Sequence, residues 1–137
     1  MNYIVIYRLI LLQSLEGSYD YNEHKQLPTP ALFDDTHGTR CAGEVAAMKN
    51  DVCGVGIAYT AKVAGLRVLS GSLTNEDEAR AVTYACNTTQ IYSCSWGPRD
   101  DGRTVEAPPE IVSKAFEGIH YLFNTKILIR SSGHKVL

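Results

Sequence analysis

The chain has 137 residues, of which 45% are hydrophobic and 20% are charged, and its formal net charge is −2. This length suits one domain, and the composition is that of an ordinary globular protein. Because the net charge is small and negative, there is no bulk electrostatic attraction to nucleic acid or to an anionic membrane, and we expect no nucleic-acid partner.

The N-terminal residues 3–12 are apolar apart from Arg8. A stretch this short cannot span a bilayer as a helix, and no basic region precedes it as in a signal peptide. We therefore expect no transmembrane segment in this chain. The segment is either a short buried strand or sequence foreign to the domain that follows.

Residues 17–36 are polar, contain Pro28 and Pro30, and predict a surface loop. Thr36 is a candidate N-cap for a helix that begins at His37 or Gly38. Small and apolar residues at helical spacing continue this helix until about Asn50.

The elements after this helix alternate between strands and helices. In chain order they are β-rich runs at 54–59 and 62–69, a helix with an acidic first turn at 76–78, a strand at 90–95, a helix from Pro108 to about Gly118 and one more strand at 126–129. Such alternation favours a parallel sheet with helices on its faces. We therefore predict an α/β fold with three layers, α/β/α, and a mainly parallel sheet.

His37-Gly38 stands at the junction between the predicted loop and helix. A histidine held there presents a partly exposed ring, as a general base for a serine hydroxyl requires. Two alternatives stay open. An isolated His-Gly is more often a histidine that packs or caps a helix, and His37 with Cys41, spaced i and i+4, can chelate zinc although no further ligand pair has a recognisable spacing.

Acidic residues gather in separate stretches, at Asp34–Asp35, at Glu76–Glu78 and at Asp100–Asp101 with Glu106. If these stretches meet in space, they form an anionic pocket for a cationic ligand. The alternative is that each is only a solvated helix end or turn.

The four cysteines and one asparagine triplet bear on the compartment of the protein. Cys41, Cys53, Cys86 and Cys94 include no C-x-x-C pair and do not fix a redox environment. Asn87-Thr88-Thr89 is an N-glycosylation acceptor triplet, which alone only hints at a secretory route.

The string from His37 to Ala47, HGTRCAGEVAA, resembles the histidine segment of the kexin- and furin-like proprotein convertases, which are subtilisin-like serine proteases. Further matching stretches follow in the same order, at 53–59, 65–69, Thr74 with Glu78-Ala79, and 91–103. S-W-G-P followed by D-D-G is specific to the convertase branch, and a cysteine before Ser95 is similar to the fungal kexins. The resemblance covers 16–118 as a partial subtilisin-like catalytic domain and leaves 1–15 and 119–137 as divergent segments.

This resemblance implies a calcium-dependent serine endopeptidase of the secretory pathway that cleaves proproteins after paired basic residues. His37 would be the catalytic base. The implied substrate-binding residues are Asp34 at S2, then Ser95, Trp96, Gly97, Pro98 and Asp100 at S1, and Leu69, Leu73, Glu78 and Glu106 at S4. Carboxylates on several loops suit the bidentate binding of arginine.

The resemblance also implies a calcium loop after the histidine helix. Its ligands would be oxygens of Met48, Asn50, Val52 and Gly54. Cys53 lies in the same loop, and its partner in the family lies beyond this C-terminus, so the resemblance implies an unpaired thiol.

Several residues that the chemistry needs are not identifiable in this sequence. No matching aspartate strand precedes His37, residues 123–126 lack the glycines of the oxyanion turn, and 131–134 is not the turn of the serine nucleophile. We therefore expect the chain by itself to be inactive, with an incomplete sheet and low stability. The alternative function is a non-catalytic module that binds basic peptides.

Overall fold

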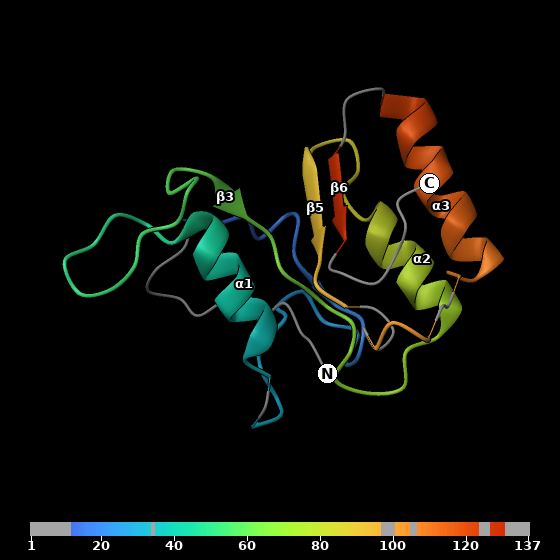
Figure 1. The fold of residues 1–137 in the computed structure, drawn as a ribbon, viewed down its shortest axis with the longest axis horizontal. Helices are drawn as coiled ribbons and strands as arrows, with labels where there is room; N and C mark the ends of the chain where they lie inside the picture. Colours follow the sequence, from blue (N-terminus) through green and yellow to red (C-terminus); the bar gives the residue numbers. More distant parts are fainter. Residues whose placement is uncertain (1–11, 34, 97–100, 105–106, 124–126, 131–137) are drawn as a thin grey trace. The chain divides into compact units, whose positions relative to one another are not determined.

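The computed structural model describes residues 12–33, 35–96, 101–104, 107–123 and 127–130 (Figure 1). The chain divides after Leu73 into two compact units, an N-terminal and a C-terminal unit. Within the described residues, helices alternate with strands and every strand pair is parallel. The predicted α/β class is therefore confirmed.

The N-terminal unit contains two short parallel strand pairs and one helix. β1 (Leu12–Gln13) pairs with β3 (Lys62–Val63), and β2 (Tyr19–Asp20) pairs with β4 (Leu66–Arg67). The connection within each pair includes helix α1 (His37–Ala46), as parallel strands require a long crossover. The β-rich run predicted at 62–69 forms two short strands instead of one buried strand, because β3 and β4 have different partners.

Helix α1 begins at His37 after the N-cap Thr36, which confirms the predicted start. The Thr36 side chain makes no capping hydrogen bond, and the helix ends at Ala46, before the predicted end at Asn50. The loop that follows closes this end of the helix. The backbone N–H of Gly56 donates to the Ala47 carbonyl at 2.8 Å, and that of Ala58 donates to the Val45 carbonyl at 2.7 Å.

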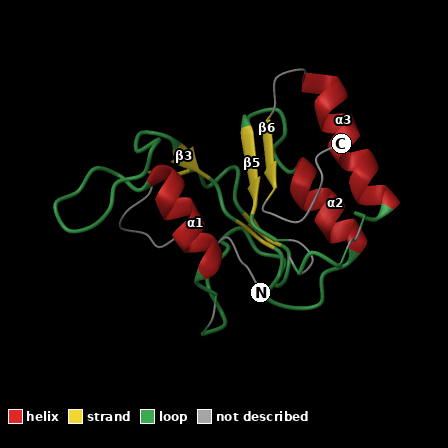
Figure 2. Cartoon of the chain, in the orientation of Figure 1, coloured by secondary structure: helices red, strands yellow, loops and turns green. Residues whose placement is uncertain are grey.

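The β-rich run predicted at 54–59 is therefore not a strand. Its N–H groups satisfy the last carbonyl groups of α1, which leaves them unable to join a sheet. Figure 2 shows this segment as part of a long loop between α1 and β3. Its β-branched and aromatic residues gave a strand signal, but Ile57 and Tyr59 are exposed.

The surface loop predicted at 17–36 is wrong in part. β2 lies within this range, and Ser18, Asp20, Tyr21 and Asp35 are buried. Polarity alone suggested exposure, whereas these polar side chains are hydrogen-bonded inside the unit.

The C-terminal unit contains helices α2 (Asn75–Thr83) and α3 (Glu110–Phe123), which lie side by side in Figure 1. The Thr74 hydroxyl accepts from the Asp77 backbone N–H at 3.1 Å, so the predicted acidic helix start is confirmed. α3 extends beyond its predicted end at Gly118. Val82 and Val112 are fully buried and mark the apolar core of this unit.

β5 (Ile91–Cys94) pairs in parallel with β6 (Ile127–Arg130), with Ile91 opposite Ile127. Burial alternates along β5, where Tyr92 and Cys94 are buried while Ile91 is half exposed, as in a strand with one face against a core. Both predicted strands are thus confirmed. None of the helices among the described residues is long and apolar enough to cross a membrane.

Candidate functional site

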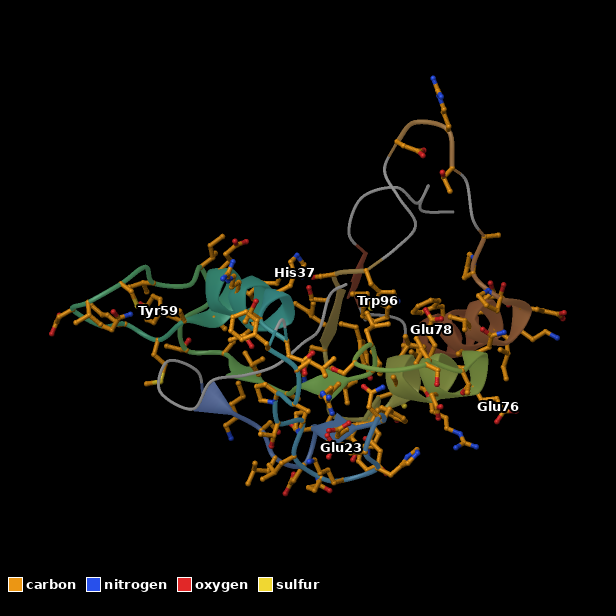
Figure 3. All side chains as sticks on the ribbon, turned by 90° about the horizontal axis from the view of Figure 1, so that it is seen from below. Glu23, His37, Tyr59, Glu76, Glu78 and Trp96 are labelled. Atoms are coloured by element: carbon orange, nitrogen blue, oxygen red, sulfur yellow. The ribbon has the colours of Figure 1, made fainter. Side chains whose placement is uncertain are left out.

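His37 is the first residue of α1 and its side chain is exposed (Figure 3). The Cys41 sulfur, one turn along the helix, lies 3.7 Å from Nδ1 and 3.8 Å from Nε2. Among the described residues, this thiol is the imidazole's hydrogen-bonding neighbour. An exposed ring at a helix start has the access that a general base needs.

The His37–Cys41 pair also bears on the zinc alternative. Zinc sites take four ligands, or three with an open position in catalytic sites. The described part of the chain contains no group of three His, Cys, Asp or Glu side chains that could hold a metal ion. Within that part, the pair has no third ligand.

Asp35, two residues before His37, accepts four hydrogen bonds. The backbone N–H groups of Ala31 and Leu32 donate to Oδ2 at 2.9 and 3.0 Å, and the Ser70 hydroxyl donates to Oδ1 at 2.8 Å. Arg67 Nε is 3.3 Å from Oδ2. The loop that leads into α1 is therefore fixed by a buried carboxylate.

These contacts decide the charge state of Asp35, whose exposed fraction is 1%. Burial tends to raise the pKa of this carboxyl, but the hydrogen bonds from the backbone of Leu32 and Ala31, from Ser70 and from the Arg67 cation together lower it. Asp35 is thus an ionised carboxylate, both oxygens of which accept hydrogen bonds inside the unit. Its carboxylate is not available to a cationic ligand, so the expected role of the Asp34–Asp35 stretch falls on Asp34 alone, which lies outside the described residues.

Arg67 links this loop to β2. Its Nη1 lies 2.9 Å from Asp20 Oδ2 and 3.1 Å from Glu23 Oε1, and the Asp20 and Arg67 side chains are almost completely buried. Burial tends to lower the pKa of Arg67, but Asp20 and Asp35 raise it above its ordinary value. We call Asp20, Asp35 and Arg67 the buried charge cluster, which the exposed Glu23 and the partly buried Ser70 contact at its edge.

The sequence reasoning missed this cluster. The signal was an arginine inside the apolar run 65–69, because an arginine within a buried strand requires acidic partners. Asp20 and Asp35 lie 47 and 32 residues away in sequence, and spacing alone did not identify them.

In the C-terminal unit, two predicted substrate-binding residues contact each other. The indole Nε1 of Trp96 donates to Glu78 Oε1 at 3.1 Å, and both side chains are partly buried. Figure 3 shows Glu78 and Trp96 together. One carboxylate oxygen accepts from the indole, and Oε2 has no hydrogen-bond partner among the described residues, so Oε2 can accept a hydrogen bond from a cationic donor.

The other predicted substrate-binding residues are less defined by the structure. Ser95 is partly buried beside Trp96 in the C-terminal unit, and Leu69 and Leu73 are partly buried in the N-terminal unit. Asp34, Gly97, Pro98, Asp100 and Glu106 lie outside the described residues.

Asp101, next to the predicted S1 acid, is engaged in its own turn. The backbone N–H groups of Thr104 and Arg103 donate to Oδ1 at 2.7 and 2.9 Å and lower the pKa of this carboxyl. Asp101 therefore shapes the loop of the acidic stretch.

The expected calcium loop is closed by the Asn50 side chain. Its amide NH₂ donates to the carbonyls of Met48 at 2.9 Å and Gly54 at 3.3 Å. Its Oδ1 accepts from the N–H groups of Val52 at 3.0 Å and Cys53 at 2.7 Å, and Cys53 is exposed and forms no disulfide. Two of the expected carbonyl ligands thus converge on one point beside Asn50.

The types of oxygen atom in this loop fit a hard cation. Carbonyl and amide oxygens are the ligands that Ca²⁺ prefers. The amide now turns its NH₂ toward the two carbonyls, and a half-turn of the amide would present Oδ1 there and break the bonds from Val52 and Cys53.

The comparison with known proteins assigns this fold and these residues to a family. The sequence model of the subtilase family matches residues 10–135, which include His37 and both units. The chain therefore belongs to the subtilase family, whose members are serine peptidases. Within this family it is of the kexin and furin type, as the similarity to individual members shows.

Three curated relatives illustrate this similarity. The chain is 58% identical over 101 residues to "Protease KEX1" of Kluyveromyces lactis, 59% identical over 99 residues to "Dibasic-processing endoprotease" of Schizosaccharomyces pombe, and 48% identical over 104 residues to "Furin" of Mus musculus. These matches cover 74%, 72% and 73% of this chain, but only 13%, 14% and 13% of those proteins.

Proposed function

We propose that this chain supplies the histidine-bearing part of a kexin-type endopeptidase that cleaves proproteins after paired basic residues. The observation that carries this proposal is His37, an exposed imidazole at the start of α1 within the stretch that matches the subtilase family. In the complete domain we propose that the parallel sheet lies between two helix layers.

His37 would accept the proton of the serine hydroxyl and return it to the leaving amine. The serine, aspartate and oxyanion asparagine of this chemistry have no match among these 137 residues. Because loss of a single member of such a triad costs several orders of magnitude in rate, we propose that the chain by itself does not hydrolyse peptides.

The specificity for basic residues is supported by the Glu78 carboxylate. Trp96 orients one of its oxygens, and the second can accept a guanidinium N–H. The Schizosaccharomyces pombe relative is named for the processing of dibasic sites. Asp34, Asp100 and Glu106 would supply the remaining carboxylates of the substrate cleft, with Ser95, Gly97 and Pro98 along its S1 wall and Leu69 and Leu73 along its apolar wall.

Calcium and the secretory pathway complete the proposal. Met48, Asn50, Val52 and Gly54 would hold Ca²⁺, which would stiffen the loop after α1 by replacing the present amide–carbonyl bonds with stronger ionic ones. The substrates would be proproteins in transit through secretory compartments.

A chimeric protease tests this function. Residues 16–118 would replace the corresponding segment of the Kluyveromyces lactis protease, which supplies the other catalytic residues, and cleavage of a fluorogenic Lys-Arg peptide would be measured. We expect activity in the chimera and its loss in His37→Ala. A folded chimera that is inactive, or one in which His37→Ala keeps its activity, would contradict the proposal.

The same chimera tests the role of Glu78. Glu78→Gln should lower kcat/KM for peptides with a third basic residue further from the cleavage site and leave peptides without it unchanged. Glu76→Gln is the matched control, because Glu76 lies on the same helix but pairs with Arg80 at the surface. Equal effects of the two substitutions would remove Glu78 from the specificity site.

The isolated chain discriminates the enzyme part from a non-catalytic module. Titration of the purified chain with a Lys-Arg peptide would show binding without turnover if it is a module for basic peptides. Absence of binding, or an unfolded circular dichroism spectrum, would exclude the module.

A further inference from the structure

The turn between α2 and β5 contains the sequence's single Asn-x-Ser/Thr triplet, Asn87-Thr88-Thr89. Asn87 is exposed, and among the described residues none forms a hydrogen bond with its side chain. The backbone turns sharply before it, with Ala85 at a φ of 50°. Asn87 therefore presents a solvated amide at a chain reversal.

The two threonines of the triplet are bound within the folded turn. The Thr88 hydroxyl donates to the Ala85 carbonyl at 3.1 Å, and the N–H groups of Thr88 and Thr89 converge on the same carbonyl at 3.0 Å. The Tyr92 phenol on β5 donates to the Tyr84 carbonyl at 2.9 Å, so the start of the turn is tied to the buried strand.

In the folded turn, the first and third residues of the triplet differ in how accessible they are to a glycosyltransferase. Transfer of an N-linked glycan uses the asparagine amide as the nucleophile and requires the hydroxyl of the third residue. In the folded unit the Asn87 amide is exposed, but Thr89 is partly buried and the backbone of the triplet is closed into a turn by N–H bonds to the Ala85 carbonyl. A glycosyltransferase can therefore bind the triplet before β5 packs against the turn. After packing, the folded turn still accommodates an Asn87 that already carries a glycan.

We propose that Asn87 is an N-glycosylation site and that the glycan is added to the nascent chain before the 84–89 turn closes. Asn87 Nδ2 forms a bond to the anomeric carbon of a lipid-linked oligosaccharide. The bond from that carbon to the lipid diphosphate breaks, the diphosphate leaves with its electron pair, and the amide loses one proton. The folded structure keeps the glycan in solvent, since the Asn87 side chain occupies no packing position.

The test uses the full chain behind a cleavable heterologous signal peptide, translated with microsomes that contain the transferase and its lipid-linked donor. We expect one discrete decrease in electrophoretic mobility that an endoglycosidase reverses. Asn87→Gln and Thr89→Ala should lose this shift. Thr88→Ala, the matched control at the middle position, should keep it because it leaves the triplet intact.

Signal-peptide cleavage reports import in every sample. An imported chain without an endoglycosidase-sensitive shift overturns the site, and so does a shift that persists in Asn87→Gln. Because the added signal peptide supplies the route, the result is independent of the protease proposal. An unmodified Asn87 leaves the chimera experiment untouched, and an inactive chimera leaves this one untouched.

The timing has its own measurement. Chain that has been translated without microsomes and folded is then offered to solubilised transferase with lipid-linked donor. We expect the shift to be lost relative to co-translational modification and restored when the same chain is offered in urea-unfolded, rapidly diluted form. Equal modification of folded and nascent chain would overturn the requirement for an open turn.

Discussion

At the scale of single residues, Arg67 determines how the N-terminal unit accommodates its buried acids. Asp20 and Asp35 are carboxyl groups with almost no solvent access, and Arg67 is the cation that contacts both. A buried pair contributes little net stability compared with an apolar replacement of both partners, but removal of one partner leaves an uncompensated charge. The cluster therefore makes the unit sensitive to changes at one position.

Arg67→Met should destabilise the N-terminal unit by about 3–5 kcal/mol, because two buried carboxylates lose their shared cation. Urea denaturation followed by circular dichroism measures this change. Arg80→Met is the control, since Arg80 is exposed and its Nη2 lies 3.9 Å from Glu76. Its loss should cost less than about 1 kcal/mol. Equal losses at the two arginines would contradict the burial of the cluster.

The pH dependence of stability should follow from Asp35. Its pKa in the folded chain is lowered from 3.8, so its contribution to stability is fully present above 3.8 and is lost as the pH falls through the lower folded value. Asp35→Asn should flatten the acid side of the stability profile, measured as urea midpoints against pH. It should not remove the slope entirely, because the pKa of Glu23 is also lowered, by Lys25 and by Arg67. An unchanged acid slope in Asp35→Asn would contradict this assignment.

At the scale of elements, α1 depends on the loop that follows it. Gly56 lies so close to the helix end that a Cβ built on it would be 2.3 Å from the Ala47 nitrogen and 2.5 Å from the Ala46 nitrogen. These are backbone atoms and cannot move away independently. The position therefore excludes every residue with a side chain unless the loop withdraws from α1.

Gly56→Ala should destabilise the N-terminal unit by about 1–3 kcal/mol through this steric conflict. Gly43→Ala is the matched control inside α1, where an added Cβ meets nothing within 4 Å. It should stabilise the helix by about 0.5–1 kcal/mol. Thermal unfolding of both variants checks the prediction, and a neutral Gly56→Ala would show that the loop is not packed on the helix.

The elements also show what the sequence could predict and what it could not. The acidic start of α2 follows from a capping rule that acts within one turn, and β5 and β6 follow from short apolar runs. The start of α1 at His37 was predicted correctly from Thr36, although the Thr36 side chain makes no capping hydrogen bond. The end of α1 and the loop at 54–59 did not follow, because tertiary hydrogen bonds from Gly56 and Ala58 decide them. The buried charge cluster did not follow either, since its members come from three distant segments.

The candidate site divides in the same way. His37 and the Glu78–Trp96 pair were named from the resemblance, and the structure adds that Glu78 and Trp96 hydrogen-bond to each other. The role of Asp35 was not foreseen, because a carboxylate beside a predicted substrate acid looked like part of the same surface. Its contacts with Arg67 and Ser70 depend on the fold and on no local pattern.

At the scale of the whole molecule, the described residues include large apolar side chains in full solvent contact. Phe33, Val52 and Ile57 are 103%, 89% and 95% exposed. All three lie in segments flanking α1. Low stability of the isolated chain stays a prediction. These three side chains are where contacts with additional protein would bury further apolar surface.

Calcium should act on the stability of the chain through the loop beside Asn50. If calcium binds only the folded state, a free calcium concentration a hundredfold above the dissociation constant raises the free energy of unfolding by about 2.7 kcal/mol. The thermal midpoint should therefore rise with a calcium salt and not with a sodium salt of equal ionic strength. Asn50→Ala should lose this rise. Lys49→Ala, at an exposed neighbour, should keep it. A rise that persists in Asn50→Ala would place the ion elsewhere.

The contact between Trp96 and Glu78 has an optical consequence. Trp96 is the only tryptophan of the chain, so indole emission comes from a single fluorophore whose N–H is bonded to one carboxylate. Any cation that competes for Glu78 changes the polarity around that indole. The chain thus carries its own spectroscopic probe at the acid proposed to select basic substrates, readable without a label and without turnover.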